Sequence, residues 1–216
     1  MNVESTIPRV GFWSALAACA ASSAYGAAQI LQVAGWVRPP WDAILIYGFS
    51  LCIASPFMIA ALAMHYLTPQ GKRFWSHAAV LFSAMYVTYV TLNYAVQLAI
   101  VLPGLSTDSV LNQTPHSLFW VVDALGYLNL GVATLFLVPT LERQGLQNWL
   151  RHFLLANAAV TPLIACVYFY PVFSVTLLYL GMPWIVTVPG STLLMALHLK
   201  TLGAERARAS ESAASL

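Results

Sequence analysis

The sequence predicts an all-α membrane protein, a helical bundle of six transmembrane helices. Lys, Arg, Asp and Glu make up 7% of the chain, against roughly 25% in an ordinary soluble domain. Hydrophobic residues reach 60%, and the mean hydropathy is +0.75. Because so few charges cannot cover the surface of a soluble protein, the solvent for most of the chain must be hydrocarbon. The apolar runs are long and continuous, which favours helices over a β-barrel.

Six apolar segments reach the length of roughly 20 residues that a membrane span needs. They are residues 10–34, 43–67, 76–102, 117–139, 153–170 and 173–198. The first segment follows Arg9 as a signal peptide would, but its apolar stretch continues to Trp36, which is too long for a signal sequence. We therefore expect a retained helix. Residues 1–203 form one transmembrane domain, and residues 204–216, rich in Ala, Ser and Arg, are expected to be a short disordered tail.

The basic residues predict the orientation, because cytoplasmic loops are enriched in Lys and Arg. Placing the N-terminus inside leaves only Arg38 on the outer side. The remaining basic residues then all lie on the cytoplasmic side: Arg9, Lys72, Arg73, Arg143, Arg151, Lys200, Arg206 and Arg208. This distribution predicts an even number of spans with both termini in the cytoplasm, and a location in the plasma (inner) membrane.

Two proline motifs suggest a weak internal symmetry. Ser55-Pro56 lies in the second segment and Thr161-Pro162 in the fifth, and these segments run in opposite directions, as a 3+3 inverted repeat requires. In each, the hydroxyl can help to satisfy the carbonyl that the proline frees. Two ordinary proline kinks are the alternative.

Several classes of function find no support in the sequence. The chain carries no HExxH, GxSxG, GxGxxG or glycine-rich phosphate loop, so catalytic residues are not assigned and an enzyme is the less favoured reading. The net charge of +2 does not suggest nucleic acid. The three cysteines lie in apolar runs without a CxxC pair, which argues against a disulfide framework. Asn112-Gln113-Thr114 matches an N-glycosylation site, a pattern short enough to arise by chance.

The polar residues inside the spans are the candidates for function. Asp123 is the one carboxylate well inside a segment, where a charge costs several kcal/mol unless it is paired, hydrated or protonated. Tyr127 lies one helical turn away on the same face. Two neighbouring segments carry polar stripes at helical spacing: Tyr25 and Gln29 in the first, and Asn93 and Gln97 in the third. The three stripes are expected to converge on an outward-opening cavity around Asp123.

Helix packing is the alternative reading of the same residues. Asn, Gln and Asp also form interhelical hydrogen bonds, typically worth under about 2 kcal/mol each. An ionisable group is a costly way to obtain one such bond, so Asp123 is the stronger candidate for a functional role. Trp184 lies between Pro183 and Pro189-Gly190, where the helix is predicted to break. It can stack on a ligand or fill the kink, and filling is favoured.

Four histidines lie near the inner boundary of the predicted membrane: His65, His77, His152 and His198. Imidazoles at one level can bind a metal ion or haem. However, no HxxxH or HxxH spacing fixes the geometry of ligands, and histidine also suits a membrane interface. No cofactor is therefore predicted.

These observations predict a protein of the lipid bilayer that binds, senses or transports a small molecule or a proton through an outer-facing polar cavity centred on Asp123. An integral membrane enzyme that acts on lipid or uses a metal or haem at the inner-side histidines is one alternative. A non-catalytic subunit whose polar residues only pack helices is another.

Overall fold

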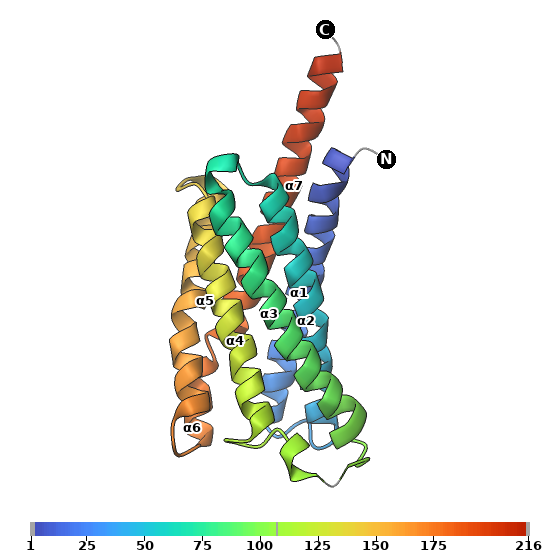
Figure 1. The fold of residues 1–216 in the computed structure, drawn as a ribbon, viewed down its shortest axis with the longest axis vertical. Helices are drawn as coiled ribbons and strands as arrows, with labels where there is room; N and C mark the ends of the chain where they lie inside the picture. Colours follow the sequence, from blue (N-terminus) through green and yellow to red (C-terminus); the bar gives the residue numbers. More distant parts are fainter. Residues whose placement is uncertain (1–2, 107, 215–216) are drawn as a thin grey trace.

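The computed structural model describes residues 3–106 and 108–214 of the chain, and every regular element in those ranges is helical. Six long helices build the fold (Figure 1): α1 (Val3–Val33), α2 (Trp41–Leu67), α3 (Arg73–Val96), α4 (Leu118–Leu137), α5 (Gly145–Phe169) and α7 (Trp184–Ala214). The short elements are η1 (Gln70–Lys72), η2 (Gln97–Val101), η3 (Ser109–Leu111), η4 (Val138–Thr140), α6 (Val175–Leu178) and η5 (Tyr179–Gly181).

The long helices form a closed ring. Each packs against the next in chain order, and α7 completes the ring by packing against α1. Both termini lie at one end of the bundle, which we call the terminal end (Figure 1). The α2–α3 and α4–α5 connections lie at this end too, whereas the connections over residues 34–40, 102–117 and 170–183 lie at the opposite end, which we call the loop end.

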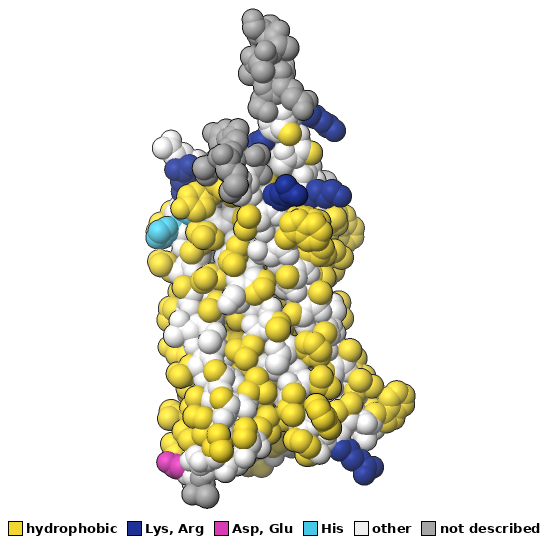
Figure 2. Space-filling view, turned by 90° about the vertical axis from the view of Figure 1, so that its right-hand side faces the viewer, with side chains coloured by type: hydrophobic (Ala, Val, Ile, Leu, Met, Phe, Trp, Pro, Cys, Tyr) yellow, Lys and Arg dark blue, Asp and Glu magenta, His cyan; other side chains and the backbone are white. Residues whose placement is uncertain are grey.

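Five helical segments are long and apolar enough to cross a membrane: Trp41–Leu67, Gln70–Val101, Leu118–Thr140, Gly145–Phe169 and Val175–Ala209. The sixth long helix, α1, has 31 residues but is rich in Ala, Ser and Gly, and these small residues dilute its hydropathy. The face of the bundle drawn in Figure 2 is covered mainly by hydrophobic side chains, and most of the Lys and Arg visible there gather towards the terminal end.

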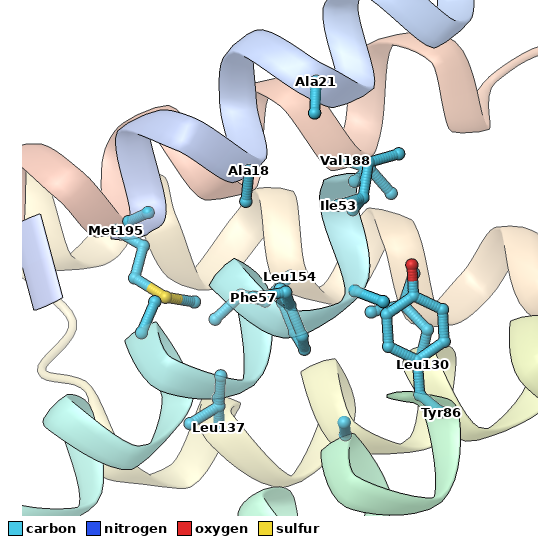
Figure 3. Close-up of a cluster of buried hydrophobic side chains, with 14 of the residues drawn as sticks. Ala18, Ala21, Ile53, Phe57, Tyr86, Leu130, Leu137, Leu154, Val188 and Met195 are labelled. Carbon is cyan, nitrogen blue, oxygen red and sulfur yellow. The ribbon is translucent and has the colours of Figure 1, made fainter. Parts of the chain in front are cut away.

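Apolar side chains fill the interior between the terminal end and the middle of the bundle. Leu137, Leu154 and Met195 are fully or almost fully buried there, with alanines of α1 beside them. Figure 3 shows these side chains converging from different helices on one core. The small residues of α1 allow it to approach its neighbours closely, as small residues do in membrane helix pairs. The hollow part of the bundle therefore lies nearer the loop end.

The break that we predicted in the last span lies earlier than expected. Between Pro183 and Gly190 the helix α7 is continuous, so the prediction of an interruption there is wrong. The chain departs from α-helix just before, in η5 and the turn that follows it. Pro183 precedes the first turn of α7, where a missing N–H leaves no gap in the ladder of hydrogen bonds, and Pro189 removes a single bond without ending the helix.

At its other end α7 extends to Ala214, beyond Gly203, after which the sequence suggested a disordered tail. Ala, Glu and Arg dominate this stretch and are strong helix formers, which accounts for the helix. Residues 215 and 216 of that tail lie outside the described residues.

The two proline motifs lie inside helices, Pro56 in α2 and Pro162 in α5. The hydroxyl of Thr161 donates to the carbonyl of Asn157, which is not the carbonyl that Pro162 frees. The inverted repeat stays a prediction.

Candidate functional site

A cavity of about 500 Å³ lies inside the ring, towards the loop end. Every long helix contributes to its wall. One side chain from each, in chain order, is Tyr25, Tyr47, Tyr94, Asp123, Tyr168 and Trp184. The wall is mainly apolar and aromatic, with a few polar groups, which is the usual composition of a small-molecule site.

Asp123 of α4 is the charged residue of this wall, and its side chain is almost completely buried. One carboxylate oxygen accepts a hydrogen bond of 2.6 Å from the hydroxyl of Tyr94. The other accepts one of 2.9 Å from Nε2 of Gln113 and a very short one from the hydroxyl of Tyr168. Three neutral donors, from α3, α5 and the α3–α4 connection, therefore stabilise the carboxylate where a buried ion pair would otherwise be needed.

Two amides, Asn93 of α3 and Gln97 at the start of η2, fix the connection that carries Gln113. Nδ2 of Asn93 donates to Oε1 of Gln113 at 3.1 Å, and Nε2 of Gln97 donates to the carbonyl of Leu111 at 2.7 Å. Oδ1 of Asn93 is buried and has no hydrogen-bond partner. These amides therefore hold residues 102–117 over the cavity and position a donor to Asp123, while neither lines the cavity itself.

A second chain of hydrogen bonds leads from the cavity towards the loop end. The hydroxyls of Tyr25 and Tyr127 lie 3.0 Å apart, and the Tyr25 hydroxyl donates to Oε1 of Gln29. Nε2 of Gln29 donates to Gln32, and Nε2 of Gln32 donates to Oδ2 of Asp42 at the start of α2. This chain fixes the side chains of α1 along one wall.

Aromatic rings surround the carboxylate. Trp184 contacts both Tyr25 and Tyr127 in edge-to-face geometry, with centroids 5.1 and 5.5 Å away. On the other side of the cavity Tyr47 stacks on Tyr94 at 5.1 Å. The ring of Trp120 lies 4.6 Å from that of Tyr168, and its indole N–H donates to the Tyr168 carbonyl.

The structure brings most of the predicted site residues together. Asp123, Tyr127, Tyr25, Gln29 and Trp184 all line the cavity. Asn93 and Gln97 stand behind the wall and act on the loop. Trp184 packs between two tyrosines at the start of α7 and does not fill a mid-helix kink.

Sequence reasoning missed the direct partners of Asp123, which are Tyr94, Tyr168 and Gln113. Tyr94 follows Asn93 in the sequence and so lies off the stripe that we considered. Tyr168 near the end of a span resembles an interfacial aromatic residue, and Gln113 stood out only as the middle of a glycosylation pattern. The signal available in the sequence was the presence of hydroxyl and amide donors near the outer ends of the spans, at about the level of Asp123.

Two of the four inner-side histidines, His65 and His77, lie side by side, but no third potential metal ligand joins them among the described residues. The rings of His65 and His77 lie 5.4 Å apart, but Nδ1 of His65 is hydrogen-bonded to Ser76 and Nδ1 of His152 lies 2.7 Å from the carbonyl of Asn148. Within residues 3–106 and 108–214, no three His, Cys, Asp or Glu side chains are placed to share an ion. The cysteines Cys19, Cys52 and Cys166 are all free.

Comparison of the chain with protein-family models, with curated proteins and with solved structures finds no match. Its function is therefore argued from the chemistry of the cavity. A carboxylate held by neutral donors inside a mainly apolar cavity can accept a proton or attract a cation, because no buried basic side chain among the described lining residues neutralises it.

Proposed function

We propose that this chain is a multi-pass integral membrane protein that binds, senses or transports a small molecule or a proton through the cavity centred on Asp123. The observation that carries the proposal is a buried carboxylate on the wall of a 500 Å³ cavity, held by three neutral donors. Helix packing alone needs neither the cavity nor the charge, since the amide of Asn157 bridges two neighbouring helices through Thr134 and Thr187.

The ring arrangement supports six spans in place of five. Helix α1 packs against α2 and α7, and both of these are apolar enough to cross the membrane. A helix of 31 residues placed between two spans crosses with them. The gathering of Lys and Arg towards the terminal end (Figure 2) supports a cytoplasmic location for that end, in a plasma (inner) membrane, because cytoplasmic loops are enriched in these residues. The cavity, nearer the loop end, opens to the outside.

The test compares Asp123→Asn with the wild type in purified protein reconstituted into nanodiscs. Thermal unfolding is followed in the presence of a panel of cationic, neutral and anionic small molecules and across a series of pH values. Asp108→Asn is the matched control, because it removes a carboxylate from the same end of the molecule but from an exposed loop position that does not line the cavity.

The proposal expects at least one panel member, or protons, to shift the unfolding midpoint of the wild type and of Asp108→Asn but not of Asp123→Asn. A ligand that binds the native state stabilises it by mass action. If neither ligand nor pH separates Asp123→Asn from the control, the carboxylate only packs helices, and the non-catalytic subunit becomes the better reading.

A further inference from the structure

When Asp123 is ionised, the cavity carries a negative charge without a cation to balance it. Asp123 is the one acidic residue among the described residues of the wall, and none of them is Lys, Arg or His. An anionic ligand would meet an uncompensated carboxylate in surroundings of low dielectric, which is strongly unfavourable. A neutral ligand would gain little from a charge that is costly to bury. The electrostatics of the wall therefore favour a cation.

Four tyrosines of the wall, Tyr25, Tyr94, Tyr127 and Tyr168, have their hydroxyl protons already engaged in hydrogen bonds. Tyr94 and Tyr168 donate theirs to Asp123. Tyr25 donates its single proton to Gln29, so its contact with Tyr127 requires Tyr127 to be the donor. Four tyrosine oxygens thus keep free lone pairs while their protons point elsewhere. Because these four oxygens offer acceptor lone pairs beside the carboxylate, this part of the wall suits a ligand that brings N–H donors or a bare positive charge.

Aromatic rings supply the remaining recognition. The ring of Trp184 is inclined by 68° to that of Tyr25 and by 76° to that of Tyr127, and the ring of Tyr168 by 38° to that of Tyr127. Rings inclined in this way do not form a parallel stack, and all of them line the cavity. A cation within about 6 Å of the face of such a ring is attracted by the ring's quadrupole.

We propose that the cavity binds an organic ammonium cation that carries apolar or aromatic substituents. Asp123 acts as its counter-ion, Tyr25, Tyr127 and Trp184 as its aromatic enclosure, and the tyrosine oxygens as acceptors for any N–H groups. The cavity volume falls in the range of sites for small organic ligands. A bare metal ion fits poorly, because in the described part of the chain Asp123 does not belong to any group of three His, Cys, Asp or Glu side chains that could hold one. This inference rests on the proposed function and specifies its ligand.

The experiment uses three probes that share a benzyl group, on the full chain in nanodiscs. Benzyltrimethylammonium is the cation, neopentylbenzene has the same shape without the charge, and benzylammonium adds N–H donors. Binding is followed by the fluorescence of the native tryptophans, two of which, Trp120 and Trp184, line the cavity, with empty nanodiscs subtracted to remove partition into lipid.

We expect both cations to bind at least about tenfold more tightly than neopentylbenzene. Asp123→Asn should lower the affinity for the cations by about tenfold or more and leave the affinity for the neutral probe unchanged. Trp184→Leu should weaken benzyltrimethylammonium several-fold. Trp149→Leu is its control, since Trp149 is exposed near the terminal end of α5. Far-UV circular dichroism and unfolding midpoints establish that each variant is folded, and Asp108→Asn again controls for surface charge.

Each outcome bears on the inference. Equal affinity for benzyltrimethylammonium and neopentylbenzene overturns the preference for cations but leaves a ligand-binding cavity in place. Cation binding that survives Asp123→Asn overturns the role of the counter-ion. Failure of all three probes overturns the inference as well, and the broader panel then decides separately whether the proposed function stands.

Discussion

The contact between α4 and α5 at Gly131 gives a sharp test of the fold. A Cβ atom added to Gly131 would lie 1.8 Å from Oγ1 of Thr161, 2.6 Å from its Cβ and 2.7 Å from its Cγ2. The Thr161 hydroxyl is hydrogen-bonded to the Asn157 carbonyl, so the side chain cannot turn away without losing that bond. Gly131→Ala must therefore move the two helices apart.

The expected cost follows from two opposing effects. Overpacking a filled interface costs about 1–3 kcal/mol, whereas Gly→Ala gains up to about 1 kcal/mol of helix propensity. A net loss of about 1–2 kcal/mol in the free energy of unfolding is expected. Gly48→Ala in α2 is the matched control, because a Cβ there meets no atom within 4 Å, and this variant should be neutral or slightly more stable.

A second substitution identifies the clash as the cause. Thr161→Ala removes Oγ1 and Cγ2 but keeps the Cβ at 2.6 Å. In the Gly131→Ala background it should therefore restore only part of the lost stability. Thr161→Gly removes all three atoms and should restore the contact, with the coupling obtained from a double-mutant cycle.

The assay is reversible unfolding of the purified protein in mixed micelles, followed by circular dichroism. Gly131→Ala should also weaken ligand binding, because Tyr168 of α5 donates to Asp123 of α4 across this interface. Equal stability of Gly131→Ala and Gly48→Ala, or no coupling with Thr161→Gly, would refute the α4–α5 packing described above.

Three further predictions concern topology, the terminal end and the cavity. In a cysteine-free background, Ser106→Cys should react with an impermeant thiol reagent from outside and Gln144→Cys only from the cytoplasm; labelling of both from one side contradicts six spans. The hydrogen bond and charge of Lys72 lower the pKa of Glu142 below its usual 4.5, so the pair stabilises the fold above that pH and its contribution is lost as the pH falls through the lowered pKa. Glu142→Gln should therefore lower the unfolding midpoint slightly at pH 7, and this loss should shrink as the pH falls below 4.5. Exposure of the pair keeps the effect small, and a loss that stays equal at every pH contradicts the linkage. Asp123→Leu should cost about 2 kcal/mol or more because it leaves three donors unpartnered, whereas Asp123→Asn should cost clearly less; equal losses in unfolding free energy argue against the hydrogen-bonded site.

The sequence was sufficient to predict the helices and part of the cavity. Apolar runs of spanning length mark where backbone groups must bond internally, so α2, α4 and α3 with η2 were predicted to within a few residues. The apolar runs do not mark the ends of the other helices: α1 and α5 begin 7 and 8 residues earlier than predicted, and α7 begins 11 residues later and ends 16 residues later. Tyr25 with Gln29, and Asp123 with Tyr127, lie four residues apart on one helix, and this spacing alone places each pair on one face. Both pairs do line the cavity.

The rotation of α3 could not be predicted. Asn93 and Gln97 form the more polar face of that helix, yet the cavity takes Tyr94 from the adjacent face. The reason lies in residues 102–117, whose backbone and side chains supply the partners of both amides. A loop that folds back over a bundle provides buried polar groups with partners that helical periodicity does not reveal.

The amide chain behind Asp123 suggests why a carboxyl group is placed there. With the carboxylate charged, Asn93 donates to Gln113 and Gln113 donates to Asp123. Turning both amides by half a turn reverses the chain, so that a protonated Asp123 donates to Oε1 of Gln113 and Gln113 donates to Oδ1 of Asn93. One amide atom of Asn93 lacks a partner in either direction, so the two directions differ little in cost. Hydroxyl groups of Tyr94 and Tyr168 can likewise accept as well as donate. A residue that only packs helices needs one fixed pattern of hydrogen bonds. A carboxyl group whose partners can hydrogen-bond to both its charged and its protonated form can gain or lose a proton, or a cation, while its neighbours keep their hydrogen bonds.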